Sequence, residues 1–196
     1  YRLCKAEVKN KPHAGLELHF QPGDVLIDTC VDGDVEAVRK QLDTGVNPNY
    51  GDADGMTGLH RACLENHLAV ASLLVSSGAD VNARDHDWWT PLHAAASAGN
   101  WRVCNMLINN GAKVTGINAA GDLPIDLAGD SKVEGVLMCE MERLELGEDK
   151  LEELRTADKT LMLEDMRTLI AAHENLNKPT NAARATHLHV AASNGF

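Results

Sequence analysis

The sequence predicts an all-α solenoid in which short helix pairs stack side by side and are joined by extended finger loops. The first observation is a repeat, because Thr57-Gly58-Leu59-His60 recurs 33 residues later as Thr90-Pro91-Leu92-His93. The second is a glycine at the same step, at positions 45, 78 and 111. The third is composition: 44% of residues are apolar but only 4% are aromatic, as closely stacked small helices require.

Each unit is expected to hold two short helices. Thr90 can cap a helix N-terminus, and Pro91 suits the first helical position, where its missing N–H has no partner to lose. Gly99 then breaks the chain before a second helix over 101–109. Gly111 ends that helix, because a left-handed C-terminal cap costs glycine least. The same pattern predicts helices near 58–65 and 68–76 in the preceding unit, and near 24–31 and 34–42 in the first.

The repeat divides the chain into four segments. Leu123-Pro124-Ile125-Asp126 keeps the step of 33, but the pattern then fails until Thr186-His187-Leu188-His189. Apolar residues at helical spacing fill the gap, with helices expected over 131–146 and within 148–172. The expected segments are an extended N-terminal segment at 1–23, the repeats at 24–130, a helical insert or degenerate repeat at 131–178, and the start of a further repeat, truncated before its second helix, at 179–196.

Charge and cysteine content exclude several classes of protein. The chain has 18 basic and 29 acidic residues, a net charge of −11, which repels nucleic acid and anionic membranes. No apolar run is long enough to span a bilayer, and the N-terminus lacks the order of a signal peptide. The five cysteines form no CxxC pair and are expected to be buried free thiols of a cytoplasmic protein.

The histidines are expected to be structural. His60, His93 and His189 hold the same place in their units, where the ring can bond the preceding threonine and the finger backbone. No cysteine or carboxylate joins them at ligand spacing. Because the sequence also lacks a nucleophile elbow and a phosphate-cradling loop, we expect no catalysis, no cofactor and no metal.

The fingers carry the candidate interface. Trp88 stands one period after Gly55, so a bulky ring is expected at a finger tip that normally favours a small residue. Exposed aromatics often anchor partners, while local packing is the alternative for this ring. Aspartates are favoured in such turns for bonds to the backbone. The candidate interface residues are Trp88, Asp52, Asp54, Asp85 and Asp87.

The repeat resembles a known family. The two Thr-x-Leu-His motifs, the step of 33 and the segment Gly78-Ala79-Asp80-Val81-Asn82 are similar to the ankyrin repeat. The resemblance implies a solenoid that binds another protein. It also extends to a modification, because Leu74, Asp80, Val81 and Asn82 resemble the ankyrin segment on which an asparaginyl hydroxylase acts, although the same residues have a structural reason to be present.

Most of the chain further resembles the regulatory subunits of type-1 protein phosphatase: the myosin phosphatase targeting subunits and, more closely in the insert, the regulatory subunit 16 group. The resemblance is carried by Leu18-His19-Phe20 ahead of the first unit, by 87–96, and by 121–127 with the acidic insert. The family has a basic residue, Val or Ile, any residue, then Phe. Here Leu18 replaces the β-branched residue, and Glu17 stands where the family prefers a basic one.

This resemblance implies a non-catalytic subunit that binds the phosphatase catalytic subunit and directs it to phosphoproteins, including cytoskeletal ones. Docking would use Leu18, His19 and Phe20; in an extended peptide the outer two point the same way and can enter adjacent pockets. It also implies a cytoplasmic location, with attachment to cytoskeleton or membrane made by segments outside this sequence. The alternative is an ankyrin scaffold unrelated to phosphatase, in which Leu18 and Phe20 cover the open end of the first unit.

Overall fold

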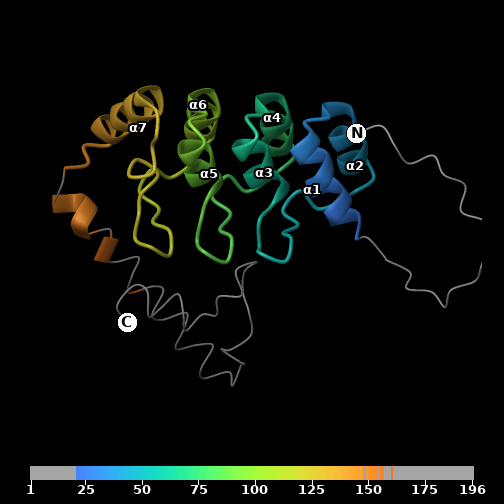
Figure 1. Ribbon diagram of the computed structural model, residues 1–196, viewed down its shortest axis with the longest axis horizontal. Helices are drawn as coiled ribbons and strands as arrows, with labels where there is room; N and C mark the ends of the chain where they lie inside the picture. The colour runs from blue at the N-terminus through green and yellow to red at the C-terminus, as the bar shows by residue number, and fades with distance from the viewer. Residues whose placement is uncertain (1–20, 148, 154, 157–159, 161–196) are drawn as a thin grey trace, which may run out of the picture.

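The computed structural model describes residues 21–147, 149–153, 155, 156 and 160. These residues form three helix pairs followed by a longer helix (Figure 1). In the described residues the only sheet-like pairing is a single bridge between Gly51 and Thr57. The predicted all-helical solenoid is confirmed. The helices are α1 (Pro22–Asp32), α2 (Val35–Asp43), α3 (Gly58–Leu64), α4 (Leu68–Ser76), α5 (Pro91–Ser97), α6 (Trp101–Asn109) and α7 (Ser131–Arg143).

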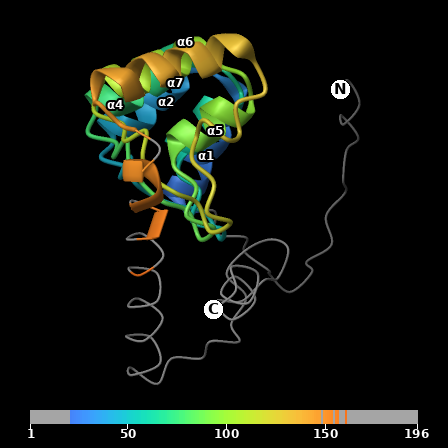
Figure 2. The same cartoon turned by 90° about the vertical axis from the view of Figure 1, so that its left-hand side faces the viewer.

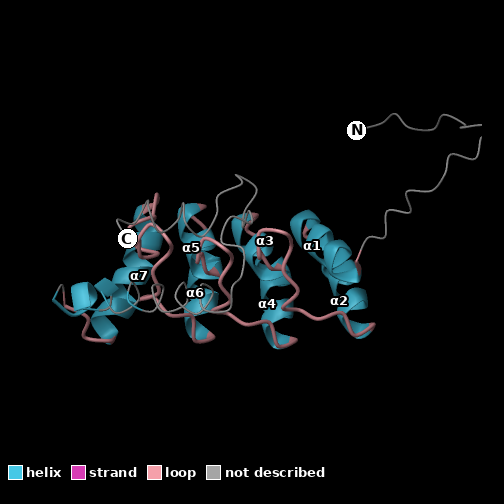
Figure 3. Ribbon diagram, turned by 90° about the horizontal axis from the view of Figure 1, so that it is seen from below, coloured by secondary structure: helices cyan, strands magenta, loops and turns pink. Residues whose placement is uncertain are grey.

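The helices lie in two rows. The inner row holds α1, α3 and α5, and the outer row holds α2, α4, α6 and α7 (Figure 3). Three finger loops, residues 47–57, 80–90 and 113–123, extend from the helices in one direction, as the end-on view also shows (Figure 2). The main contacts join neighbouring units, so the fold is close to a one-dimensional array.

The core uses the same positions in every unit. Leu26, Leu59 and Leu92 are fully buried in the inner row, each 33 residues after the last. The outer row has an equivalent set that includes α7, so α7 is the outer helix of a fourth unit. Its fully buried members are Val38, Ala71, Cys104 and Leu137.

The first helix begins two residues earlier than the repeat pattern suggests. Pro22 takes the first helical position, and the backbone N–H of Gln21 donates to Asp24 Oδ2 at 3.1 Å. This reciprocal cap stabilises a helix start at Pro22, so the expected extended segment 1–23 overlaps α1 by two residues. Residues 1–20, which include the proposed docking motif, lie outside the described residues.

The fourth unit has turns where the others have an inner helix. Residues 124–127 form turns, and Asp126 occupies the position that His60 and His93 hold earlier. Asp126 Oδ2 accepts from the backbone N of Leu123 at 2.8 Å and from Arg155 Nη2 at 2.8 Å. The insert therefore supplies a guanidinium beside a motif that, in earlier units, contacts the next finger.

The predicted helical insert is described only in its first part. The helix expected over 131–146 is α7, which ends at Arg143, and residues 149–153, 155, 156 and 160 are also helical. The rest of the expected helix within 148–172, and the further repeat at 179–196 with Thr186 and His189, lie outside the described residues.

Candidate protein-interaction surface

One side chain closes the turn of each finger. Asp52 Oδ1 accepts from the backbone N atoms of Asp54 and Met56 at 3.0 and 2.9 Å. The equivalent atoms of Asp85 and Asn118 do the same one and two periods later, to residues 87 and 89 and to residues 120 and 122, at 2.8–3.0 Å. The expectation that finger aspartates bond the backbone is confirmed for Asp52 and Asp85.

The fingers are also bonded to one another. The backbone N of His86 donates to the carbonyl of Asp54 at 3.0 Å, and the backbone N of Ala119 donates to the carbonyl of Asp87 at 2.9 Å. The expected interface residues 54 and 87 thus link neighbouring fingers through their backbones. Lateral bonding holds the three finger tips in a fixed arrangement, which lowers the entropy lost when a partner binds.

Asparagine side chains bridge the bases of the fingers. Asn82 Nδ2 donates to the carbonyl of Gly111 at 3.1 Å, and its Oδ1 accepts from the backbone N of Lys113 at 2.9 Å. Asn49 makes the same pair of bonds to Gly78 and Asp80 at 3.2 and 2.7 Å. The structural reason for an asparagine at position 82 is therefore present in the fold.

The two described histidines of the repeat motif are structural, as predicted. His93 Nδ1 accepts from the backbone N of Thr90 at 3.1 Å, and Nε2 lies 3.2 Å from the carbonyl of Asp122. Since a carbonyl can only accept, the proton is on Nε2. His60 repeats this with Thr57 and the carbonyl of Trp89.

These histidines are neutral at physiological pH. Burial is the main cause that lowers the pKa of His93 to about 4, and burial also lowers the pKa of His60. Both rings are completely buried, so no substrate can reach them. Within the described residues no group of three or more His, Cys, Asp or Glu side chains is placed to hold a metal ion.

Trp88 sits in a backbone conformation that favours glycine. Its φ is +62°, while the equivalent residues of the neighbouring fingers, Gly55 and Gly121, have φ of +80° and +89°. The Arg84 guanidinium lies 4.5 Å from the Trp88 ring centroid, a cation–π contact that the sequence interpretation missed. The ring is half-buried, so it is packed locally and still partly presented at the finger tip.

Asp85 carries a charge that its surroundings disfavour. Burial is the main cause that raises its pKa to about 6. Asp52, one period earlier, instead pairs with Arg61 at 2.9 Å, and the residue at Arg61's position one period later is Ala94. Asn118 shows that an asparagine closes the same turn without a charge.

We therefore expect Asp85→Asn to raise the free energy of unfolding by about 1 kcal/mol at pH 8, after discounting for partial exposure. The folded pKa is above the unfolded one, so the penalty develops as pH rises from about 4 through 6 and the gain should vanish at pH 4. Urea unfolding at both pH values measures it. Asp52→Asn, which loses the Arg61 pair, is the control and should not stabilise; an equal gain in both variants would contradict the explanation.

The cysteine prediction holds for three residues and is wrong for one. Cys30, Cys63 and Cys104 are buried free thiols, and burial raises the pKa of Cys30 and of Cys104 to about 12. Cys139 is exposed, because the buried stripe of α7 runs through Val133, Leu137 and Met141 instead. Cys4 lies outside the described residues.

Comparison with known proteins agrees with this geometry. Residues 26–118 match the family model of ankyrin repeats in three copies. The chain is similar to "Ankyrin repeat domain-containing protein 46" of Danio rerio, 42% identical over 43 residues, which is 22% of this chain and 19% of that protein. It is similar to the Rattus norvegicus protein of that name, 37% identical over 49 residues, 25% of this chain and 22% of that protein.

The matched part thus spans about a fifth of the length of these relatives, and the family match contains no catalytic domain. None of the helices in the described residues has the length and hydrophobicity needed to cross a membrane. The repeats, their finger loops and the 33-residue period agree on one assignment. Residues 26–118 are ankyrin repeats, and the chain is an ankyrin-repeat protein that carries a protein-interaction scaffold.

Proposed function

We propose that the chain is a non-catalytic regulatory subunit that binds the catalytic subunit of a type-1 serine/threonine protein phosphatase and directs its substrate choice. The observation that carries the proposal is the position of Leu18, His19 and Phe20. They precede the helix start at Pro22 by one residue, so a docking peptide there would place the phosphatase beside the first unit. Hydrolysis would belong to the partner.

The fingers would supply a second contact. Three of the four candidate aspartates lie in turns whose backbone bonds fix them, and the net charge of the chain is −11. Charge complementarity therefore favours a basic region of the phosphatase or of its phosphoprotein substrate facing Asp54, Asp85 and Asp87. Trp88, stacked on Arg84, would be the aromatic anchor of this surface.

The test is calorimetric titration of the intact chain with purified type-1 phosphatase catalytic subunit, at low and at raised salt. We expect saturable binding that weakens as salt rises, because rim charges act over about 10 Å at 0.1 M salt. Absence of binding at micromolar concentrations of both proteins would remove the phosphatase from the proposal and leave the scaffold assignment unchanged.

One observation favours the second candidate, a scaffold unrelated to phosphatase. Val25 and Val31 of α1 are 37% and 39% exposed, so the first unit offers apolar surface that Leu18 and Phe20 would cover in this alternative. The two candidates differ in whether these side chains contribute to affinity or to stability.

Asn82 is the proposed modification site. An asparaginyl hydroxylase would have to open the two bonds that hold the Asn82 side chain to Gly111 and Lys113. We expect one added oxygen on Asn82, measured by fragment mass spectrometry after incubation with the enzyme. Asn49 is an internal control, since it makes the same bonds but has Gln41 where Leu74 precedes Asn82; an unmodified Asn82 would end this proposal.

A further inference from the structure

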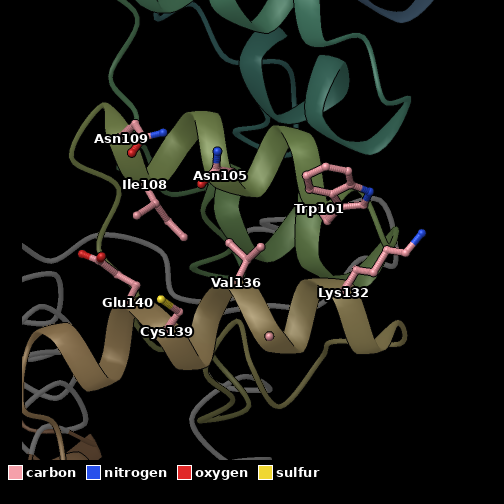
Figure 4. Close-up of a pocket in the computed structure, with 9 residues that line it drawn as sticks. Trp101, Asn105, Ile108, Asn109, Lys132, Val136, Cys139 and Glu140 are labelled. Carbon is pink, nitrogen blue, oxygen red and sulfur yellow. The ribbon is translucent and has the colours of Figure 1, made fainter.

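A groove runs between α6 and α7 in the outer row, on the side of the helices away from the fingers (Figures 1 and 4). It has a volume of about 420 Å³. Ile108 of α6 and Val136 and Cys139 of α7 line its middle, and Trp101 and Lys132 lie at one end (Figure 4). Its size and largely apolar lining are those of a small-molecule site.

The groove is open because of a glycine in α7. Gly135 lines it, and a Cβ added at this position would meet no atom within 4 Å. Glycine costs a helix interior about 1 kcal/mol relative to alanine, and Gly135 is not among the residues with positive φ. Backbone geometry therefore does not require a glycine here, and its effect is to leave space between the two helices.

The two ends of the groove differ in charge. Lys132 is exposed and makes no ion pair with another described residue, and the Arg102 guanidinium lies 5.0 Å from the Trp101 ring centroid at the same end. At the other end Glu140 accepts two bonds from Arg143, at 2.6 and 2.7 Å. An anionic group is therefore attracted to the Lys132 end and has no free cation at the Glu140 end.

We infer that this groove binds a soluble, elongated apolar molecule with one carboxylate head, of the class of medium-chain carboxylates. The head lies at Lys132 and the apolar body lies along Ile108, Val136 and Cys139. Lys132 and Glu140 are eight residues apart, about 12 Å along a helix at 1.5 Å per residue, so a single unbranched chain matches the length. The inference is independent of the proposed phosphatase partner.

The test titrates the chain with octanoate, decanoate and dodecanoate, each below the concentration at which it forms micelles. Binding is followed by amide chemical shifts of α6 and α7 and by the rate at which N-ethylmaleimide alkylates Cys139, read by peptide mass spectrometry. We expect slower alkylation of Cys139 and a Kd that tightens by up to about tenfold for each added pair of methylenes. Decylamine, with a cationic head, should bind more weakly than decanoate.

Three variants locate the ligand. Lys132→Glu should weaken decanoate binding about tenfold, because it reverses the charge at the head. Gly135→Leu should abolish binding by filling the groove, whereas Gly135→Ala should bind as tightly as the original chain. Thermal unfolding confirms that each variant folds. The inference is overturned if dodecanoate shows no saturable binding, if decylamine binds as well as decanoate, or if Gly135→Leu binds unchanged.

Discussion

Replacing His93 with alanine is expected to lower the free energy of unfolding by about 3 kcal/mol. The ring is completely buried and joins its own unit, through the backbone N of Thr90, to the next finger, through the carbonyl of Asp122. Alanine removes both bonds and leaves a cavity at the contact between two units. Urea unfolding followed by far-ultraviolet circular dichroism measures the change.

His67→Ala is the matched control. His67 is half-buried and makes one bond across units, from Nε2 to the carbonyl of Val31 at 2.9 Å, so its loss should cost about 1 kcal/mol or less. Equal effects of the two substitutions would contradict the role assigned to the buried ring of His93.

The same ring makes stability depend on pH. Burial lowers the pKa of His93 from 6.5 to about 4, so between these values the unfolded chain binds a proton that the folded chain does not. Stability from this residue is complete above pH 6.5 and is lost as pH falls toward 4, by up to about 3 kcal/mol. Asp85, whose pKa is raised to about 6, acts in the opposite direction. His93→Ala should therefore flatten the acid side of the stability curve; an unchanged slope would refute this.

Replacing Leu18 and Phe20 together with alanine is expected to weaken binding to the phosphatase catalytic subunit by at least about a hundredfold. Burying a leucine and a phenylalanine in partner pockets contributes about 1.5–3 kcal/mol each, and each 1.4 kcal/mol is tenfold in Kd. Thermal stability of the isolated chain should barely change. Titration calorimetry and thermal unfolding of the same preparations give both quantities.

His19→Ala is the control for this pair, because in an extended segment its side chain points away from those of Leu18 and Phe20. It should retain most of the affinity. If the double substitution instead lowers the melting temperature by several degrees and leaves phosphatase affinity unchanged, these side chains cover the first unit and the docking proposal fails.

Much of the fold was predictable from the sequence, because one period sets both the motifs and the packing. Leu59 and Leu92 are buried at the same position of their units, and Gly111 ends its unit with a positive φ, as the pattern indicates. The helix start at Pro22 was missed, since it depends on a reciprocal cap between Gln21 and Asp24 that no repeat position encodes.

The candidate surface was less predictable. Aspartates in the finger turns follow from local turn chemistry, but the bonds between fingers, such as that from His86 to Asp54, join residues far apart in the sequence. Position 88 was noticed because a tryptophan replaces a glycine, while its partner Arg84 gave no signal of its own. The groove beside Gly135 depends on how α7 packs on α6, and the only sequence signal for it was a glycine inside a helix.

The asparagine bridges make whole units interchangeable. The partners of Asn49 and of Asn82 are backbone atoms 29 and 31 residues further along the chain, so the bridge does not depend on which side chains the next unit carries. If the 33 residues from 50 to 82 were excised, Asn49 would take the place of Asn82 opposite Gly111 and Lys113 and find the same carbonyl and the same N–H. The array can therefore change length by a full period without any new joint, whereas a loss of any other number of residues breaks the register.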